Sequence, residues 1–467
     1  MIFNKYHIVY FIGVGGIGMS ALSRWFISNG KRVYGYDKTP SAITQKLETE
    51  GIEISFEDSI EAIPEMVKSN KEHTLVIYTP AIPKAHKGIN YLREEGFTIL
   101  KRAEVLGLIT KSHQTIAVAG THGKTSTSGM IAHALYHAGA NVTGFLGGII
   151  RNYESNFIQS KKNRPDSLMV VEADEFDRSF LQLEPNIAII TSADADHLDI
   201  YGDREQLVQA YRDFGMKVRE DGYLILNAAI ASTIKEDTDF PATIITYGIE
   251  KGTYQAKRVR IEKHRFVFDL LGPDLDIQGI TLQMPGFHNI ENAVAAIISM
   301  HLRGISSEKI KKGIESYKGV KRRFETVYAG PDTIYIDDYA HHPAEIEAFI
   351  KSVRAMYKGK RITAIFQPHL FTRTRDFAIG FSNSLSLADE VILLPIYPAR
   401  EEPILGVKSE MLLDDINADD VRLVEKDDLI DELATRRLEI LLTIGAGDID
   451  RLVEPIAKHL KSRTYAD

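Results

Sequence analysis

The 467-residue chain contains no cysteine. This absence excludes disulfide bonds, catalytic thiolates and zinc sites built from cysteine ligands. It agrees with a cytoplasmic location, which we expect, because disulfides belong to oxidising compartments. The chemistry of this protein must therefore be carried by carboxylates, histidines, hydroxyls, amides and cationic side chains.

The chain also lacks long apolar runs and an excess of basic residues. No run approaches the 18 or so apolar residues of a membrane-spanning helix, so we expect no membrane insertion. The apolar stretch at residues 8–14 is interrupted by glycines and has no cleavage pattern, so we do not read it as an export signal. A net charge of −8 argues against a nucleic-acid partner and confines phosphate binding to local pockets.

With 44% hydrophobic residues, the chain can form two to four globular domains. Apolar β-branched runs alternate with segments of helical spacing along most of its length, which predicts an α/β fold. Turn-rich alternation at residues 254–284 predicts a small antiparallel sheet.

One candidate binding site is the glycine-containing stretch Gly120-Thr121-His122-Gly123-Lys124-Thr125-Ser126. It follows a strand-like run and precedes a helical segment, an order that presents backbone N–H groups and a helix dipole to a phosphate chain. Lys124 adds a full charge, and the Thr125 hydroxyl can reach Mg²⁺. Val118 stands where the longer Walker pattern has a glycine, so an ordinary strand-to-helix turn remains the alternative to ATP binding.

The N-terminal stretch Gly13-Val14-Gly15-Gly16-Ile17-Gly18-Met19 also joins a strand to a helix. Asp37 follows about 20 residues later, at the end of the next strand. This pattern fits a diphosphate beside a ribose, which both NAD and a UDP-sugar provide. Close packing of helix and strand is the structural alternative for the glycines.

Acidic residues follow two strands in the middle of the chain. Glu172 comes directly after the run 168–171, and His197 follows the run 186–191. Ligands of parallel sheets bind beyond the carboxyl ends of strands, so both side chains are predicted to contact a metal or phosphate. Helix capping or solvent exposure is the alternative for the neighbouring acids, and His133 and His137 are interpreted as packing or surface residues.

Polar pairs mark two further segments. Asn289 and Asn292 share a helix face and present donors and acceptors that suit an adenine edge, although Asn289 alone fits a helix N-cap. Arg373 and Arg375 would lie on the same side of an extended segment, though not of a helix, and would suit a carboxylate or phosphate.

Taken together, these motifs resemble the Mur ligases of peptidoglycan synthesis over essentially the whole chain. The motifs that carry the resemblance are Gly13-Val-Gly-Gly-Ile-Gly-Met19, Gly120-Thr-His-Gly-Lys-Thr125, Glu172-Ala-Asp-Glu175, Asp196-His-Leu-Asp199, His288-Asn-Ile-Glu-Asn292, Arg322-Arg-Phe324, Asp337-Asp-Tyr-Ala-His-His-Pro343, Gln367-Pro-His369, Ile396-Tyr-Pro-Ala-Arg-Glu401 and Gly445-Ala-Gly-Asp448.

The resemblance implies three domains: a Rossmann-like UDP-sugar domain at residues 1–107, a central P-loop-type ATP-binding domain at 108–318 and a Rossmann-like closing domain at 319–467. It also implies that ATP, with Mg²⁺, phosphorylates a sugar carboxylate to an acyl phosphate, which an amine then attacks. Residues 206–215 contain no lysine where many relatives carry a carbamylated one. That departure points to the branch that joins L-alanine to UDP-N-acetylmuramate.

The resemblance implies a role for each motif residue. Lys124 and Arg323 would contact the ATP phosphates, Thr125 and Glu172 a first Mg²⁺, and His197 a second Mg²⁺. The remaining assignments are Gly120, Thr121, His122, Gly123, Ser126, Asn289, Asn292 and Asp338 for ATP; Gly13, Gly15, Gly16, Gly18, Met19, Asp37, Thr79 and Ala81 for the UDP-sugar; and His341, Arg373 and Arg375 for the amino acid and acyl phosphate.

Three other functions remain open at the level of the sequence. A recycling ligase would attach a preformed tripeptide to the same sugar. An NAD-dependent oxidoreductase would explain the first glycine loop and leave the second unused, and a non-catalytic protein could use ATP as a switch. The sequence predicts no oligomeric state.

Overall fold

The computed structural model describes residues 3–160, 167–194, 201–399 and 401–464. They form two compact units, each described by itself. The first unit comprises Met1–Lys257, Asp269–Ile280 and Glu291–Tyr317, and the second comprises Arg258–Phe268, Thr281–Ile290 and Lys318–Asp467. No helix in the described part of the chain is long and apolar enough to cross a membrane.

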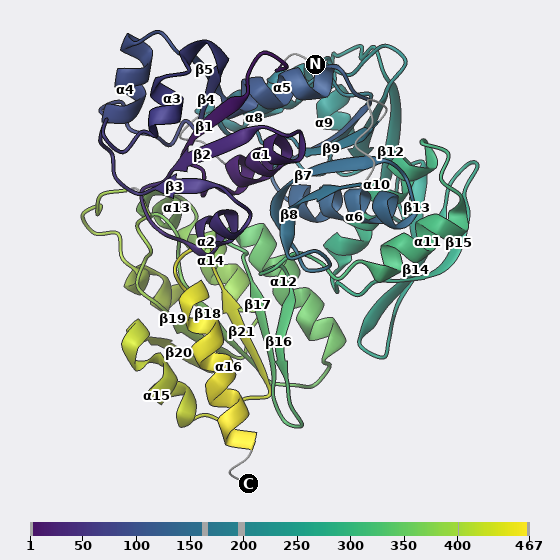
Figure 1. The fold of residues 1–467 in the computed structure, drawn as a ribbon. Coiled ribbons are helices and arrows are strands. Elements are labelled where there is room, and N and C mark those ends of the chain that lie inside the picture. The colour runs from purple at the N-terminus through teal and green to yellow at the C-terminus, as the bar shows by residue number, and fades with distance from the viewer. Residues whose placement is uncertain (1–2, 161–166, 195–200, 400, 465–467) are drawn as a thin grey trace. The chain divides into compact units, whose positions relative to one another are not determined.

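The first unit begins with a parallel five-stranded sheet in the order β3-β2-β1-β4-β5. Its elements, shown in purple and blue in Figure 1, are β1 (Ile8–Ile12), α1 (Ile17–Ser28), β2 (Arg32–Tyr36), α2 (Ala42–Thr49), β3 (Glu53–Ser55), α3 (Glu65–Lys68), β4 (Thr74–Tyr78), α4 (Lys87–Glu94), β5 (Thr98–Lys101) and α5 (Arg102–Lys111). Strand β1 lies between β2 and β4, so the first glycine loop stands at the point where the strand order reverses.

A ten-stranded sheet follows in the order β15-β14-β13-β12-β11-β10-β6-β9-β7-β8. Its strands are β6 (Thr115–Ala119), β7 (Val142–Ile150), β8 (Ser155–Gln159), β9 (Leu168–Glu172), β10 (Ile187–Ile190), β11 (Tyr223–Asn227), β12 (Thr243–Ile249), β13 (Tyr254–Glu262), β14 (Arg265–Leu271) and β15 (Asp276–Thr281). The helices are α6 (Lys124–His137), α8 (Arg204–Gly215), α9 (Ala231–Lys235), α10 (Phe287–His301) and α11 (Ser307–Ser316).

The strands predicted at residues 254–284 are confirmed, but they do not make a small sheet of their own. They extend the large sheet. Residues 247–249 of β12 pair in parallel with residues 254–256 of β13. Gly252 makes the tight connection, with a φ of +88° and no room for a Cβ against the backbone of Tyr247.

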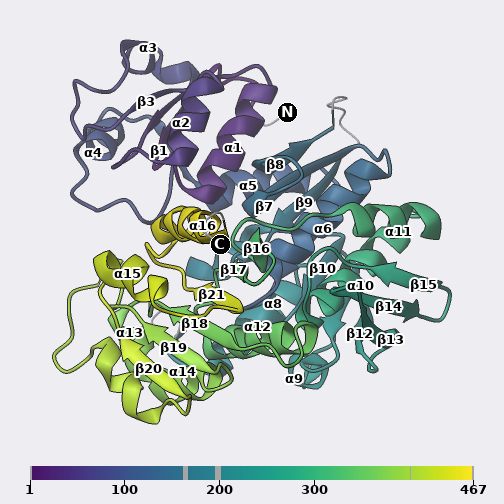
Figure 2. The same ribbon diagram turned by 90° about the horizontal axis from the view of Figure 1, so that it is seen from below.

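The second unit contains a six-stranded sheet in the order β16-β17-β21-β18-β19-β20, parallel except for the β16–β17 pair. Figure 2 shows α16 on one face of this sheet and α12 and α14 on the other. The elements are β16 (Glu325–Ala329), β17 (Ile334–Asp338), α12 (Pro343–Met356), β18 (Ile362–Phe366), α13 (Phe371–Asp376), α14 (Ala378–Leu385), β19 (Glu390–Leu393), β20 (Asp420–Leu423), α15 (Leu429–Ala434), β21 (Ile440–Ile444) and α16 (Asp450–Thr464).

Candidate active site

The predicted phosphate loop joins the buried strand β6 to helix α6. Gly120 and Gly123 have φ angles of +125° and +82°, which L side chains rarely adopt. A Cβ on Gly120 would also overlap the Thr191 hydroxyl at the end of β10. The predicted order of strand, glycine loop and helix is confirmed.

Lys124 is the first residue of the helix that follows this loop, and 14% of its side chain is exposed. Its Nζ donates to the carbonyl oxygen of Gly120 at 2.6 Å and forms an ion pair with Oε1 of Glu175 at 2.8 Å. Burial lowers the pKa of Lys124, but Glu175 and the nearby carboxylates of Asp174 and Glu172 raise it above its ordinary value. Lys124 is therefore a fixed cation at the N-terminus of α6, where an anion is favoured.

Glu172 is the last residue of strand β9, whereas the sequence placed it directly after that strand. Its Oε2 accepts from the backbone N–H of Gly147 at 2.9 Å, and its carboxylate is hydrogen-bonded to the Thr125 hydroxyl. Burial raises the pKa of Glu172, while Lys124 and the Thr125 hydrogen bond lower it. A carboxylate and a hydroxyl side by side are hard oxygen donors that fit Mg²⁺, which commonly takes one or two carboxylates plus substrate phosphates.

The end of β10 holds the other side of the loop. The Ser192 hydroxyl accepts from the backbone N–H of His122 at 2.8 Å and lies 2.9 Å from the Thr121 hydroxyl. The Thr121 hydroxyl also accepts from the backbone N–H of Asp194 at 3.1 Å. Ser126 is a buried residue in the first turn of α6. His197, the predicted ligand of a second metal ion, lies outside the described residues.

The two asparagines of α10 are both buried. Asn292 lies against the phosphate loop, because a Cβ on Gly123 would be 2.5 Å from its Oδ1. The Nδ2 of Asn289 donates to the carbonyl oxygen of Pro285 at 2.7 Å. The N-cap alternative for Asn289 is wrong, since α10 begins at Phe287.

The carboxylate of Asp37 is hydrogen-bonded to the backbone of the first glycine loop. Oδ2 of Asp37 accepts from the N–H of Gly15 at 2.7 Å. Gly13 has a φ of +88° and packs against Thr79, at the end of the neighbouring strand β4. Ala81 is exposed.

A cavity of about 240 Å³ connects this loop with Glu172. Its walls come from the start of α1, the ends of β4 and β5, strand β7 and the end of β9. The lining residues that matter for the site are Gly16, Gly18, Met19, Thr79, Arg102, Gly147, Glu172 and Asp174. The N-terminal glycine loop and the predicted metal-binding carboxylate thus share one cavity, as the sequence could not establish.

The predicted residues of the second unit form a network around the end of β17. Asp338 accepts from the backbone N–H groups of Phe324 at 2.6 Å and Ala340 at 2.8 Å. Burial raises its pKa to about 6. Arg323 lies over the Tyr339 ring at 5.1 Å and within 3.6 Å of Glu345.

His341 lies on the same carboxylate. Its Nδ1 is 3.3 Å from Oε2 of Glu345, and its backbone N–H donates to that oxygen at 3.0 Å. Sequence reasoning missed Glu345, although its place in the first turn after Pro343 is a signal for a carboxylate at a helix N-terminus. Helix α12 begins at Pro343, whose fixed φ suits the first position of a helix.

The segment with Arg373 and Arg375 is the helix α13, so the extended alternative is wrong. Residues two apart on a helix point to different sides, so the two guanidinium groups do not form one fork. Arg375 pairs with its neighbour Asp376 at 2.7 Å. The sequence did not decide between an extended and a helical segment here, because nothing in the spacing of these residues excludes a helix.

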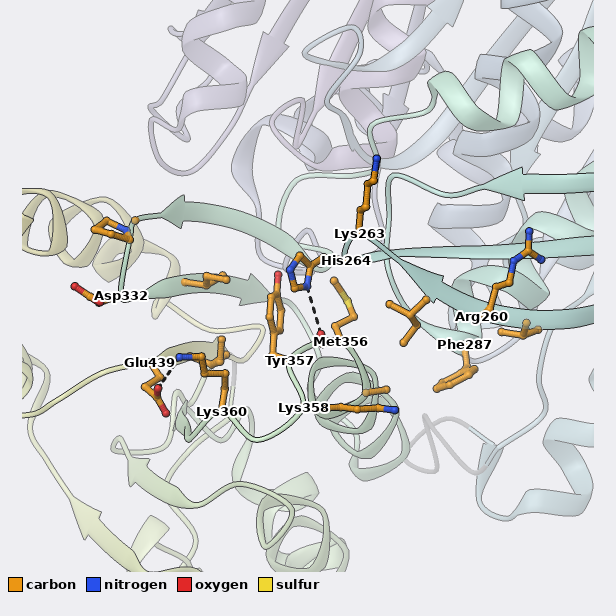
Figure 3. Close-up of a pocket in the computed structure, with 17 residues that line it drawn as sticks. Arg260, Lys263, His264, Phe287, Asp332, Met356, Tyr357, Lys358, Lys360 and Glu439 are labelled. Atoms are coloured by element: carbon orange, nitrogen blue, oxygen red, sulfur yellow. Dashed lines mark hydrogen bonds and ion pairs between the residues drawn. The ribbon is translucent and has the colours of Figure 1, made fainter.

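A larger cavity, of about 850 Å³, lies in the second unit (Figure 3) and contains no predicted site residue. His264 stacks on Tyr357 at its centre, with 5.2 Å between ring centroids. Two of its basic side chains already have carboxylate partners, Lys360 with Glu439 at 2.8 Å and Arg260 with Glu262 at 2.6 Å. Its remaining charges are exposed, so this cavity indicates no chemistry.

Comparison with known proteins places this geometry in a family. The chain matches the Mur ligase family catalytic domain at residues 8–114, the Mur ligase middle domain at 118–300 and the Mur ligase glutamate ligase domain at 322–447. Each match covers one of the glycine loops or the Asp338 network.

Curated relatives are similar over almost their full length. The UDP-N-acetylmuramate–L-alanine ligase of Parabacteroides distasonis is 47% identical over 465 residues, covering 98% of both chains. That of Flavobacterium psychrophilum is 48% identical over 461 residues, covering 98% of this chain and 99% of the relative.

Solved structures give the same fold. The UDP-N-acetylmuramate–alanine ligase of Thermotoga maritima matches with a TM-score of 0.81 and 28% identity, covering 97% of this chain and 99% of the other. A murein peptide ligase from Psychrobacter arcticus has a TM-score of 0.70 at 21% identity, covering 97% and 98%, which supports the fold alone. On the three domain matches and this full-length similarity, the chain belongs to the Mur ligase family.

Proposed function

We propose that this protein joins L-alanine to the lactyl carboxylate of UDP-N-acetylmuramate at the expense of ATP. The observation that carries the proposal is the cavity shared by the first glycine loop and Glu172. A UDP-sugar bound through its diphosphate at that loop can extend its carboxylate toward the Glu172 end. Names of relatives at 47% identity support the same substrates.

A carboxylate is a poor electrophile, so we propose that ATP first phosphorylates it to an acyl phosphate, which the amine of L-alanine then attacks. Donor and acceptor are both anionic, so positioning and charge neutralisation carry most of the catalysis. Lys124 holds a positive charge against the ATP phosphates, and the backbone N–H groups of residues 120–126 bind them. Thr125 and Glu172 would hold Mg²⁺, which supplies further charge neutralisation when bound.

The other predicted residues keep the roles proposed from the sequence. Asn289 and Asn292 would contact adenine, Asp338 the ribose and Arg323 the phosphates. His341, Arg373 and Arg375 remain candidates for the amino acid and acyl phosphate, although the helical α13 requires the two arginines to act separately. His197 remains the candidate for a second metal ion, and the domain boundaries at 107 and 318 remain predictions. We also propose a cytoplasmic location, on the absence of cysteine.

The test is phosphate release from ATP in the presence of UDP-N-acetylmuramate and a panel of amine substrates. We expect release that requires both UDP-N-acetylmuramate and L-alanine. A strong preference for the tripeptide would favour the recycling ligase instead. Tight binding of NADH with no affinity for UDP-sugars would favour an oxidoreductase, and ATP binding without any phosphate release would favour a switch protein.

A further inference from the structure

Arg102 is the one basic residue among the described residues that line the 240 Å³ cavity. It is the first residue of α5 and directly follows β5. Its side chain therefore starts from the same carboxyl edge of the first sheet as the glycine loop, where ligands of such sheets bind. The Arg102 side chain is 20% exposed, which leaves it accessible from the cavity.

The guanidinium group lies against the glycine loop. A Cβ on Gly18 would be 2.5 Å from Nη1 of Arg102 and 3.2 Å from its Cζ. Gly18 is the second residue of α1, whose first turn has no acidic side chain and whose N-cap has no side-chain hydrogen bond. A cation beside the positive end of a helix dipole is unfavourable by itself and becomes favourable when an anion binds both.

The contact between Arg102 and the carboxylate of Asp174 is weak. Nη2 is 3.5 Å from Oδ2 of Asp174, well beyond the 2.7–2.9 Å or so of a strong charge-assisted hydrogen bond. Asp174 is 40% exposed, and its other oxygen accepts from the N–H of Phe176 at 3.1 Å. A guanidinium group has five N–H donors in a planar fork that matches phosphate oxygens. The Asp174 pair leaves most of this capacity unused.

The charges of the cavity also have a direction. Glu172 stands beside Gly147 of β7, whereas Arg102 stands beside Gly18 at the N-terminus of α1 and contacts Asp174. An acceptor with both a diphosphate and a carboxylate is drawn into one orientation by this arrangement. Its doubly charged diphosphate lies at the Arg102 end, and its carboxylate extends toward Glu172.

We propose that Arg102 binds the diphosphate of the UDP-sugar and so orients the acceptor in the cavity. The inference rests on the proposed function, because it takes a UDP-sugar as the ligand. On binding, the guanidinium group exchanges its long contact with Asp174 for hydrogen bonds to phosphate oxygens. Arg102 is a binding and orienting residue and takes no part in proton transfer.

The test is calorimetric binding of two UDP-sugars, without ATP, to the wild-type protein and to the variants Arg102→Ala and Arg102→Lys. UDP-N-acetylmuramate carries the lactyl carboxylate, whereas UDP-N-acetylglucosamine has the same diphosphate without it. Lys101→Ala is the matched control, because Lys101 is adjacent, pairs with Asp177 at 3.4 Å and lies outside the cavity lining. Thermal unfolding checks that each variant is folded.

We expect Arg102→Ala to raise the Kd of both sugars by roughly tenfold or more, as the loss of a charge-assisted hydrogen bond implies. Arg102→Lys should recover part of the affinity, Lys101→Ala should stay within about twofold of the wild type, and the KM for ATP should not change. If Arg102→Ala does not fold, the comparison of Arg102→Lys with Lys101→Ala still tests the proposal.

Unchanged affinity in both Arg102 variants would overturn the proposal. A loss confined to UDP-N-acetylmuramate would assign Arg102 to the carboxylate and would also overturn it. If the wild-type protein binds both sugars but releases no phosphate with L-alanine, the proposed function fails while the role of Arg102 stands. If it binds neither sugar, both proposals fail.

Discussion

The two glycine loops of the first unit are built alike and charged differently. Each follows a buried strand in the middle of a parallel arrangement and opens a helix of at least twelve residues, β1 into α1 and β6 into α6. The second loop carries its own cation, Lys124, at the first position of its helix. The first loop has no charged residue in that position, and the guanidinium group beside it comes from α5.

The difference indicates what each loop does. Lys124 is fixed by the fully buried Glu175, so its charge is held in place before any ligand binds. Such preorganised charge is what phosphoryl transfer requires. At the first loop, Asp37 occupies the Gly15 N–H and Arg102 has a long contact of 3.5 Å with Asp174, an arrangement suited to binding and release. Under the proposed function, the comparison distinguishes a loop for catalysis from a loop for binding.

The largest expected effect is that of Lys124→Ala. We expect kcat to fall by about a thousandfold or more, because the fixed charge at the transferred phosphoryl group is lost. Stability should fall by about 3–5 kcal/mol, since Glu175 is left buried and uncompensated. Steady-state kinetics and denaturant unfolding measure the two effects.

The double variant Lys124→Ala/Glu175→Gln is the control for folding. It removes the unpaired charge and should recover much of the stability while the activity stays lost. Recovery of activity together with stability would show that Lys124 acts only through the fold, and the contrast between the loops would collapse.

Gly147→Ala should have the next largest effect. A Cβ at this position would overlap both carboxylate oxygens of Glu172, so that carboxylate must move. We expect the Mg²⁺ concentration for half-maximal activity to rise about 10–100-fold, the usual range for misplaced support of a metal ligand. Gly248→Ala is the matched control, because its Cβ would meet nothing closer than 3.5 Å. Equal Mg²⁺ dependence in both variants would rule out the role of Glu172.

Gly15→Ala tests the first loop in the same way. Its Cβ would lie 2.8 Å from Oδ2 of Asp37 and 2.8 Å from Cγ2 of Thr44, so the loop must shift. We expect the KM for UDP-N-acetylmuramate to rise by about tenfold, with the KM for ATP unchanged. Asp37→Asn keeps an oxygen acceptor for the Gly15 N–H and should lose less. A matching rise in the KM for ATP would contradict the separation of the two loops.

Ser192→Ala should have the smallest effect and the opposite selectivity. It removes the acceptor of the His122 N–H at 2.8 Å and the partner of the Thr121 hydroxyl at 2.9 Å, neutral hydrogen bonds worth about 0.5–1.5 kcal/mol each. We expect the KM for ATP to rise by a few-fold while the KM for UDP-N-acetylmuramate stays the same. Kinetics with each substrate varied in turn will show whether the change stays on the ATP side.

Most of the fold could be predicted from local sequence. Buried parallel strands appear in a sequence as short apolar runs, and β2, β4, β11 and β21 coincide with such runs. The fate of β13 to β15 could not be predicted in this way. Which sheet a strand joins depends on nonlocal pairing, and the pairing of β12 with β13 has no signature in either segment.

The site was predicted less completely. Lys124, Thr125 and Glu172 lie together because the ends of adjacent parallel strands, β6 and β9, bring them there. The partners that hold them were missed. Glu175 appears in the sequence as one acid among several, Gly147 as a glycine within a strand, and Arg102 as an arginine after a short strand. Their roles depend on contacts between segments far apart in the chain.

The central claim is that the phosphate loop transfers a phosphoryl group to a carboxylate bound from the first loop. The most direct measurement uses UDP-N-acetylmuramate labelled with ¹⁸O in its lactyl carboxylate, together with ATP and L-alanine. Because the acyl phosphate breaks at its carbonyl carbon, one labelled oxygen should appear in each released phosphate. Release of phosphate that carries no ¹⁸O from the labelled substrate would contradict the account.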